Sequence, residues 1–167
     1  PYGFSFFFEN GASKNVSLLG MPDENDWVLL NPYTDKTFMR DLMSYDLGRA
    51  LGWYASRAQF LELFVDGDYK GVYVLLEKIK RDDERVDIAK LDNTMNSGDA
   101  LTGGYIYKID KTTGNSGGVW YSSNYGVSLQ NHVPSWDEIT TTQQNYLQSY
   151  ITTFENSLVS SAYANPQ

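Results

Sequence analysis

A chain of 167 residues is long enough to bury one apolar core, and its hydrophobic share of 41% excludes a disordered tail. Its net charge of -8 disfavours a nucleic-acid partner, because polyanions bind basic surfaces. The longest basic stretch, residues 78–85, is interleaved with acidic residues and is interpreted as a solvated charged loop. The absence of cysteine excludes disulfides and thiolate zinc sites, and no apolar run reaches the roughly 20 residues that span a bilayer.

The first thirty residues predict short strands separated by turns. The aromatic run at 2–8 favours a buried strand, residues 9–11 a turn and residues 16–19 a second strand. A further apolar strand at 27–30 is expected to end at Asn31, because a residue before proline avoids the helical region.

Residues 35–51 predict the first helix. Thr34 or Asp35 can cap its start, and Gly52 can end it because glycine readily adopts the left-handed conformation. Apolar side chains recur at the three-and-four spacing of one helical stripe. The stripe consists of Phe38, Met39, Leu42, Met43, Leu47, Ala50, Leu51 and Tyr54.

Residues 58–65 and 72–79 predict a hairpin. Asp66 and Gly67 supply the positive φ angles that a tight turn requires, and Gly71 marks a bulge at the start of the return strand. On that return strand, alternation places Glu77 on the same face as Tyr73 and Leu75.

The second half of the chain predicts two strands and a long helix. The polar stretch at 80–100 is long enough to contain a helical turn or a functional segment. Residues 105–110 and 119–121 favour strands, and Thr140 with Gln143 forms a capping box for a helix at 141–160. Its apolar stripe is Leu147, Tyr150, Ile151, Phe154 and Leu158. We therefore predict an α+β fold, a mainly antiparallel sheet with at least two packed helices, in a single domain or fragment spanning 1–167.

Three motifs are weak evidence for a catalytic serine, a metal site and a phosphate-binding loop, respectively. Residues 114–118 fit the G-x-S-x-G pattern, but the one histidine, His132, follows the serine in an order unlike that of the chymotrypsin-like proteases, so a glycine turn is favoured. The acidic residues at 82–87 lack the order of a calcium loop, and no metal site is predicted. Gly103 and Gly104 can cradle a phosphate or simply permit a tight turn.

Lys108 has two interpretations. A lysine in a strand that also carries Ile106 and Ile109 must reach water or meet an anion, and a nucleotide phosphate or Glu77 would serve as that partner. The alternative is an edge strand whose polar face is exposed.

Several of these segments together resemble the CotH family of atypical protein-kinase-like proteins. The resemblance runs through Trp27, the Asn31-Pro-Tyr33 step, the Met39-Arg40-Asp41 step, and the two strands Gly71-Val-Tyr-Val-Leu-Leu-Glu-Lys78 and Gly103-Gly-Tyr-Ile-Tyr-Lys-Ile-Asp110. It extends over most of residues 18–158 and is specific in combination.

The resemblance implies phosphoryl transfer from ATP, with Mg²⁺, to coat or cell-surface proteins. It implies that Lys108 contacts the nucleotide and that Glu77 is its carboxylate partner. It also implies an exported protein of the cell surface or periplasm, whose catalytic aspartates lie in a Trp-Asp-Phe-Asp type of step. Because the nearest step here is Trp136-Asp137-Glu138, we expect the chain to be the N-terminal portion of a kinase-like domain and inactive by itself.

Two alternatives remain from other functional classes. An exported carbohydrate-binding module would use exposed aromatic side chains as stacking platforms for a polysaccharide. The candidates are Trp53, Trp120, Tyr121, Tyr125 and Trp136. A purely structural surface component with a kinase-like fold is the other alternative, since a fold does not fix a function.

Overall fold

The structure, a computed structural model, describes residues 1–112 and 118–160. The chain divides into two compact units, Pro1–Asp87 and Ile88–Gln167, and each is described by itself. Within the described residues, each unit contains one antiparallel sheet, and helices accompany both. The predicted α+β class is therefore confirmed.

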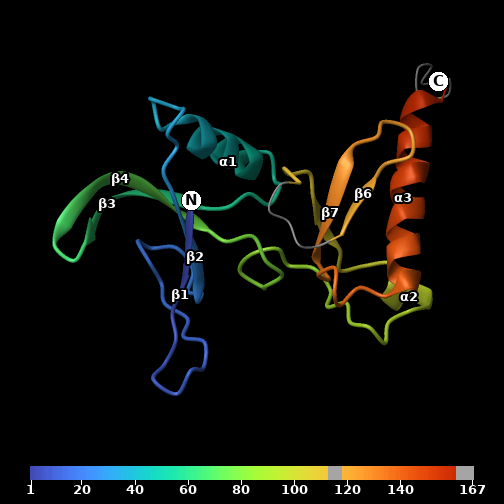
Figure 1. Ribbon diagram of the computed structural model, residues 1–167, viewed down its shortest axis with the longest axis horizontal. Coiled ribbons are helices and arrows are strands. Elements are labelled where there is room, and N and C mark those ends of the chain that lie inside the picture. Colours follow the sequence, from blue (N-terminus) through green and yellow to red (C-terminus); the bar gives the residue numbers. More distant parts are fainter. Residues whose placement is uncertain (113–117, 161–167) are drawn as a thin grey trace. The chain divides into compact units, whose positions relative to one another are not determined.

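The first unit is built on a four-stranded sheet (Figure 1). Its strands are β1 (Tyr2–Ser5), β2 (Asp26–Leu30), β3 (Ala58–Val65) and β4 (Asp68–Glu77), in the spatial order β1-β2-β4-β3. The apolar core gathers around Met21, Trp27 and Leu75. Trp27 lies directly opposite Glu77 in the β2–β4 register, so a carboxylate stands beside the core.

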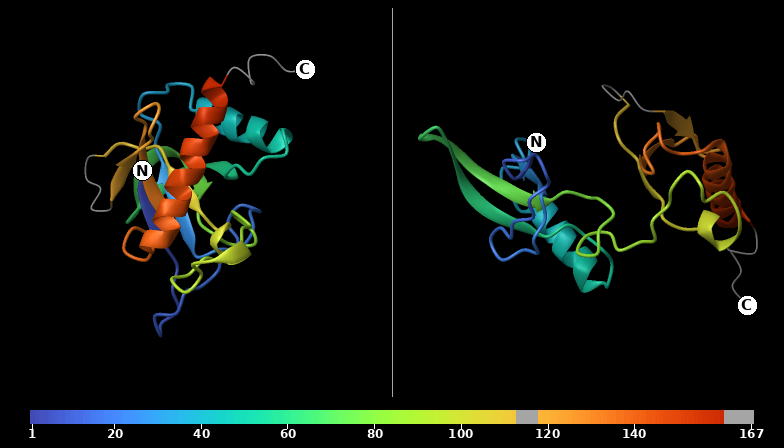
Figure 2. Two further views of the ribbon diagram at one scale, coloured as in Figure 1. Left: turned by 90° about the vertical axis from the view of Figure 1, so that its right-hand side faces the viewer. Right: turned by 90° about the horizontal axis from the view of Figure 1, so that it is seen from below.

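The predicted hairpin between β3 and β4 is confirmed. Asp66 and Gly67 have φ angles of 53° and 83°, and the register shifts between Leu63 and Phe64 opposite Gly71, whose φ is 104°. The return strand begins at Asp68, four residues before the prediction, because pairing continues through the bulge. Figures 1 and 2 show this hairpin extending beyond β1 and β2.

The first helix, α1 (Arg40–Ala50), starts five residues later than predicted. Asp35 does not cap it; its carboxylate instead accepts hydrogen bonds from the Thr37 and Arg40 main-chain N–H groups and holds a turn before the helix. The predicted stop is confirmed, because Gly52 has a φ of 82° and donates to the Arg49 carbonyl. No residue of α1 is buried, and most of its apolar stripe is exposed to solvent, while Phe38 and Leu42 are half-buried.

Two predictions for the N-terminal region were wrong. Strand β1 ends at Ser5 and is mostly exposed, so the aromatic run is not a buried strand. Residues 16–19 do not form a strand, because Leu19 and Gly20 both take positive φ angles and leave Val16 with only an isolated bridge to Glu24.

The second unit contains a three-stranded sheet and a long helix. Its elements are α2 (Gly98–Leu101), β5 (Ile106–Lys108), β6 (Val119–Tyr121), β7 (Ser128–Val133) and α3 (Thr141–Val159), and the sheet order is β5-β7-β6. The central strand β7 was not predicted. It contains the polar residues Gln130, Asn131 and His132, so it lacks the apolar alternation that indicates a strand.

Helix α3 packs along this sheet (Figure 2). The predicted capping box is present: Gln143 donates its main-chain N–H to the Thr140 hydroxyl, and its side chain accepts from the Thr140 N–H. Leu147 and Ile151 join Trp120 and Leu129 in the core of the unit. The remaining members of the predicted stripe, Tyr150, Phe154 and Leu158, stay exposed.

Candidate functional site

Glu77, predicted from the sequence as a site residue, lies at the end of β4 with its side chain fully buried. Its Oε1 accepts hydrogen bonds from Arg57 Nη1 at 2.7 Å and Arg85 Nη1 at 2.9 Å, and its Oε2 accepts from the Arg57 main-chain N–H at 2.8 Å. One carboxylate is thus shared by two guanidinium groups. The register of β4 fixes it there, because Glu77 pairs with Trp27 of β2.

Arg85 is the more enclosed of the two arginines. Its side chain is 0% exposed, against 41% for Arg57. The guanidinium carbon lies 5.2 Å from the centre of the Trp27 ring, within the range of a cation–π contact. Among the described residues, the Nε of Arg85 has no hydrogen-bond partner. The electron-rich surface beside the guanidinium is the face of the Trp27 indole ring. The cluster of Glu77, Arg57 and Arg85 carries one surplus positive charge.

A second ionic cluster, formed by Glu24, Asp26 and Lys80, neighbours the first. Lys80 Nζ donates to Glu24 Oε1 at 2.9 Å and to Asp26 Oδ2 at 3.3 Å. Burial alone would lower the pKa of Lys80, but the hydrogen bond and charge of Glu24, followed by those of Asp26, raise it overall. Burial opposes ionisation of Asp26, yet the Ser5 hydroxyl and the Lys78 and Lys80 ammonium groups lower its pKa.

These clusters correct the interpretation of residues 78–85 as a solvated charged loop. Two cations of that segment, Lys80 and Arg85, turn inward to carboxylates on β4 and just before β2. Sequence reasoning found Glu77 but missed Arg57, Arg85 and Glu24. The available signal was the charge balance, since a buried glutamate in an apolar strand requires cationic partners.

Lys108, the other predicted site residue, lies at the end of β5 in the second unit. Its side chain is 45% exposed and its ammonium lies 3.3 Å from Asp110 Oδ2. The Lys111 main-chain N–H, followed by the Lys108 ammonium, lowers the pKa of Asp110. Lys108 is opposite Gln130 in the register, whereas Tyr107 is opposite Asn131, which contacts Gln144 of α3. Lys108 therefore points to the sheet face away from α3.

Of the two glycines before β5, Gly104 is required by close packing, whereas a side chain at Gly103 would meet only an ordinary contact. Gly104 has a φ of 84°, and a Cβ added there would stand 2.4 Å from the Ala89 carbonyl oxygen. Only glycine fits at that position without a shift of the backbone. No bound ligand is needed to explain why glycine occupies position 104.

The other sequence motifs are placed as follows. Residues 114–117 of the G-x-S-x-G pattern lie outside the described residues, while Gly118 packs against the Trp136 ring. Asp82 accepts the Glu84 N–H inside a tight loop. Across residues 1–112 and 118–160, no group of three or more acidic or histidine side chains is placed to hold a metal ion.

Of the predicted stacking aromatics, Trp120 was wrongly chosen. It is buried in the core of the second unit, and its Nε1 donates to Asn131 Oδ1. The other four members, Trp53, Tyr121, Tyr125 and Trp136, are exposed.

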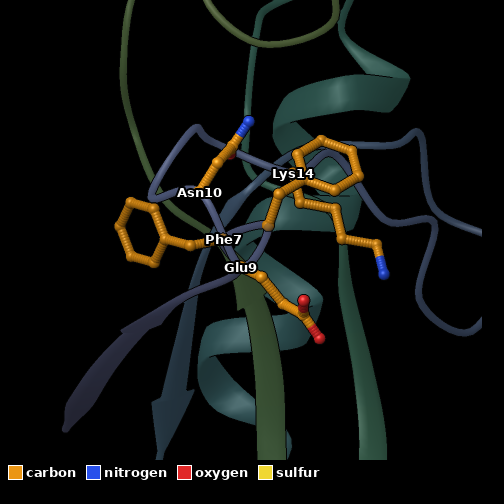
Figure 3. Close-up of a pocket in the computed structure, with 5 residues that line it drawn as sticks. Phe7, Glu9, Asn10 and Lys14 are labelled. Atoms are coloured by element: carbon orange, nitrogen blue, oxygen red, sulfur yellow. The ribbon is translucent and has the colours of Figure 1, made fainter.

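An unpredicted surface hollow lies in the loop after β1. It is lined by Phe7, Phe8, Glu9, Asn10 and Lys14, and Figure 3 shows the Glu9 and Lys14 side chains extending away from Phe7. The Lys14 ammonium lies 5.6 Å from the centre of the Phe8 ring. The hollow is an exposed feature of a turn, and its charged side chains are open to solvent.

Fold and site together describe an α+β protein that encloses a carboxylate–arginine cluster in one unit and presents an exposed lysine on a sheet in the other. A family model described as CotH kinase protein matches residues 2–166. The chain therefore belongs to the CotH family, and the resemblance seen in the sequence is confirmed. A search of curated proteins and a search of solved structures each found no match. In the part of the chain that the structure describes, no helix is both long and apolar enough to cross a membrane.

Proposed function

We propose that this chain contributes the nucleotide-contacting part of a CotH-type protein kinase, which transfers phosphate from ATP to coat or cell-surface proteins. Lys108 is assigned to the phosphates of ATP. The observation that carries the proposal is the state of its ammonium group, which is exposed and, within the described residues, lies 3.3 Å from the exposed carboxylate of Asp110. An exposed pair of this kind contributes little free energy, so a phosphate can replace the carboxylate.

The residues fit ATP better than they fit a resident magnesium ion. Lys108 is a flexible donor suited to a phosphate oxygen. The described residues, in contrast, hold no cluster of carboxylates for a divalent cation, so no magnesium ligand is assigned here. ATP bound at Lys108 would supply the phosphoryl group, and the protein's own contribution is to orient it.

Glu77 enters the proposal as a residue that positions the end of β4. Both of its oxygens are engaged by Arg57 and Arg85 within the first unit. Lys108 belongs to the other unit, and a direct pairing between the two remains a prediction. The expected surface location and the protein acceptors are parts of the same proposal.

The test is ATP binding by two matched lysine variants. Lys108→Met is expected to weaken binding of a fluorescent ATP analogue by about tenfold, the effect of losing one charged hydrogen bond. Lys90→Met is the control, because Lys90 is likewise exposed, in the same unit and paired with an aspartate, Asp92. Equal affinities for the two variants would refute the role of Lys108.

Carbohydrate binding is the second candidate. The observation in its favour is the exposure of Trp53, Tyr121, Tyr125 and Trp136. Retention on an insoluble polysaccharide that is lost in Trp53→Ala, while ATP binding is absent, would favour this function over phosphoryl transfer.

A further inference from the structure

A hollow of about 160 Å³ lies between the sheet of the second unit and the C-terminal half of α3. Its floor includes Leu129 of β7 and Ile151 of α3, which are both buried. Around the floor stand apolar side chains that are exposed or half-buried: Tyr107, Ile109, Tyr125, Val127, Phe154 and Leu158. We call this feature the Glu155 hollow, because Glu155 is the charged side chain that lines it.

The helical period brings Glu155 into this apolar place. Residues four apart share one face of a helix, so Glu155 continues the buried face that contains Leu147 and Ile151. The loop between β6 and β7 lies against the same part of α3 (Figure 1), and its Asn124 side chain donates to Asn156 Oδ1 at 2.8 Å. Glu155 is consequently only 6% exposed.

The carboxylate of Glu155 has no cationic partner. Its Oε2 accepts the main-chain N–H of Asn124 at 3.0 Å. Within the described residues, no second hydrogen bond and no ion pair reaches the carboxylate. The sequence at 113–117 and at 161–167 contains no Lys, Arg or His. A carboxylate has about four acceptor sites, and buried carboxylates are normally paired with a cation, so this one has capacity for a positively charged group.

The remaining polar atoms of the lining are uncharged hydroxyl groups. The Ser122 hydroxyl accepts the main-chain N–H of Val127 at 3.1 Å. Burial raises the pKa of Tyr107, so its phenol stays neutral at physiological pH. The rings of Tyr107, Tyr125 and Phe154 line the hollow, and aromatic faces attract cations. The lining therefore favours a ligand that combines a positive charge with an apolar body.

The volume of the hollow limits the size of that body. An apolar cavity of about 150 Å³ binds benzene, so a hollow of about 160 Å³ suits one six-membered ring or an apolar group of similar size. A sugar fits less well, because it presents many hydroxyl groups to walls that are mostly apolar. Phosphates are disfavoured here, because their charge has the same sign as that of Glu155.

We propose that the Glu155 hollow binds a small organic ammonium compound, whose cationic group pairs with the Glu155 carboxylate and whose apolar body lies against Leu129 and Ile151. The apolar walls supply affinity and the carboxylate supplies specificity. An uncharged ligand of the same shape would leave the buried carboxylate without a cation and would therefore bind more weakly. The inference does not depend on phosphoryl transfer.

The probe for the test is benzylamine, which consists of one ring and one primary ammonium group. Benzyl alcohol is the matched neutral ligand. Binding to the 167-residue chain is followed by NMR through the methyl signals of Leu129 and Ile151, which lie at the floor of the hollow. A fragment of this size is expected to bind with a Kd of about 1 mM. Benzyl alcohol should bind about tenfold more weakly, the effect of losing one charged hydrogen bond.

The matched protein variants are Glu155→Gln and Glu138→Gln. Both change the net charge equally, but Glu138 is exposed and does not line the hollow. Glu155→Gln keeps the side-chain shape and an oxygen that can accept the Asn124 N–H, so it should weaken benzylamine about tenfold and leave benzyl alcohol unchanged. Glu138→Gln should alter neither ligand.

A second pair of variants tests the apolar wall without changing the charge. Phe154→Ala should weaken benzylamine and benzyl alcohol by similar factors, because both lose contact with the ring. Tyr121→Ala is its control, since Tyr121 alternates with the buried Trp120 and lies on the sheet face away from α3. This pair retains the test even where Glu155→Gln fails to fold, because Phe154 is 54% exposed.

Several results would overturn the proposal. They are unchanged Leu129 and Ile151 methyl signals at about 10 mM benzylamine, equal affinities of the native chain for benzylamine and benzyl alcohol, or equal effects of Glu155→Gln and Glu138→Gln. The last arm compares n-butylamine with a lysine blocked at both its main-chain ends, which carries the same alkylammonium group. Equal binding of these two would assign the hollow to a lysine side chain of a partner protein and reject the small molecule.

Discussion

Replacing Glu77 by glutamine tests the central role of the carboxylate–arginine cluster. Glutamine keeps the volume of the side chain but removes the negative charge that Arg57 and Arg85 share. Removing one partner of a buried ion pair costs about 3–5 kcal/mol, because the other charge stays buried without compensation. Arg85 is fully buried and bears that cost, whereas Arg57 is 41% exposed and is partly relieved by water.

We therefore expect Glu77→Gln to lower the free energy of unfolding by about 3 kcal/mol, the lower end of that range. With a urea dependence of about 2 kcal/mol per molar, the midpoint would fall by about 1.5 M. The assay is urea unfolding followed by tryptophan fluorescence, since Trp27 contacts Arg85. Glu62→Gln on β3 is the matched control, because Glu62 is exposed and should change stability by less than about 0.5 kcal/mol.

A midpoint for Glu77→Gln within error of the Glu62→Gln value would refute the reasoning. It would mean that the two arginines find water or other acceptors when the carboxylate is lost. The double variant Glu77→Gln/Arg85→Met provides a further check. Removing both charges should restore part of the lost stability, because the double variant leaves no unpaired Arg85 charge beside Trp27.

The remaining predictions concern Lys80 and Gly104. The raised pKa of Lys80 means that its contribution to stability is fully present below its ordinary value of 10.5 and is lost as pH rises through the folded-state value. Lys80→Met should therefore lose less stability than the native chain as pH rises above about 10.5, measured in chemical unfolding curves. An unchanged pH dependence in Lys80→Met would contradict this. Gly104→Ala should destabilise the protein by more than about 1 kcal/mol, because its Cβ meets the Ala89 carbonyl at a positive φ. Gly126→Ala is the control, because Gly126 has a φ of 62° and lies in open space, so its replacement measures the backbone cost alone. Equal losses of stability in Gly104→Ala and Gly126→Ala would exclude the clash with the Ala89 carbonyl.

Local patterns in the sequence predicted the elements whose signals are local. The β3–β4 turn depends on Asp66 and Gly67 themselves, and the start of α3 on the reciprocal bonds of Thr140 and Gln143, so both were placed correctly. The start of α1 was placed wrongly. The Asp35 carboxylate could either cap the helix or hold a turn before it, and only the fold decides between the two. The apolar stripe of α1 matched helical periodicity, yet periodicity says nothing about whether a surface is available to cover it.

The partners in the candidate site depend on contacts between distant residues. Glu77 was recognisable as a carboxylate in an apolar strand, but Arg57 and Arg85 lie 20 and 8 residues away along the chain. The strand β7 was missed for a related reason. Gln130 and Asn131 are polar residues made compatible with burial by hydrogen bonds to the main chain after β5 and to Gln144 of α3.

The outer half of the β3–β4 hairpin has a consequence for solubility. β2 pairs only with Val74 and the residues after it, so beyond that point β3 and β4 form a two-stranded ribbon, and β3 is an unpaired edge of the sheet. Phe60, Phe64 and Val65 are exposed along this edge, and Glu62 is the charge between them. Long apolar edges favour strand pairing between molecules. The net charge of -8 opposes such pairing by repulsion, and salt screens that repulsion beyond about 10 Å at 0.1 M. Colloidal stability of this protein should therefore decline as ionic strength rises, with the β3 edge as the starting point of association.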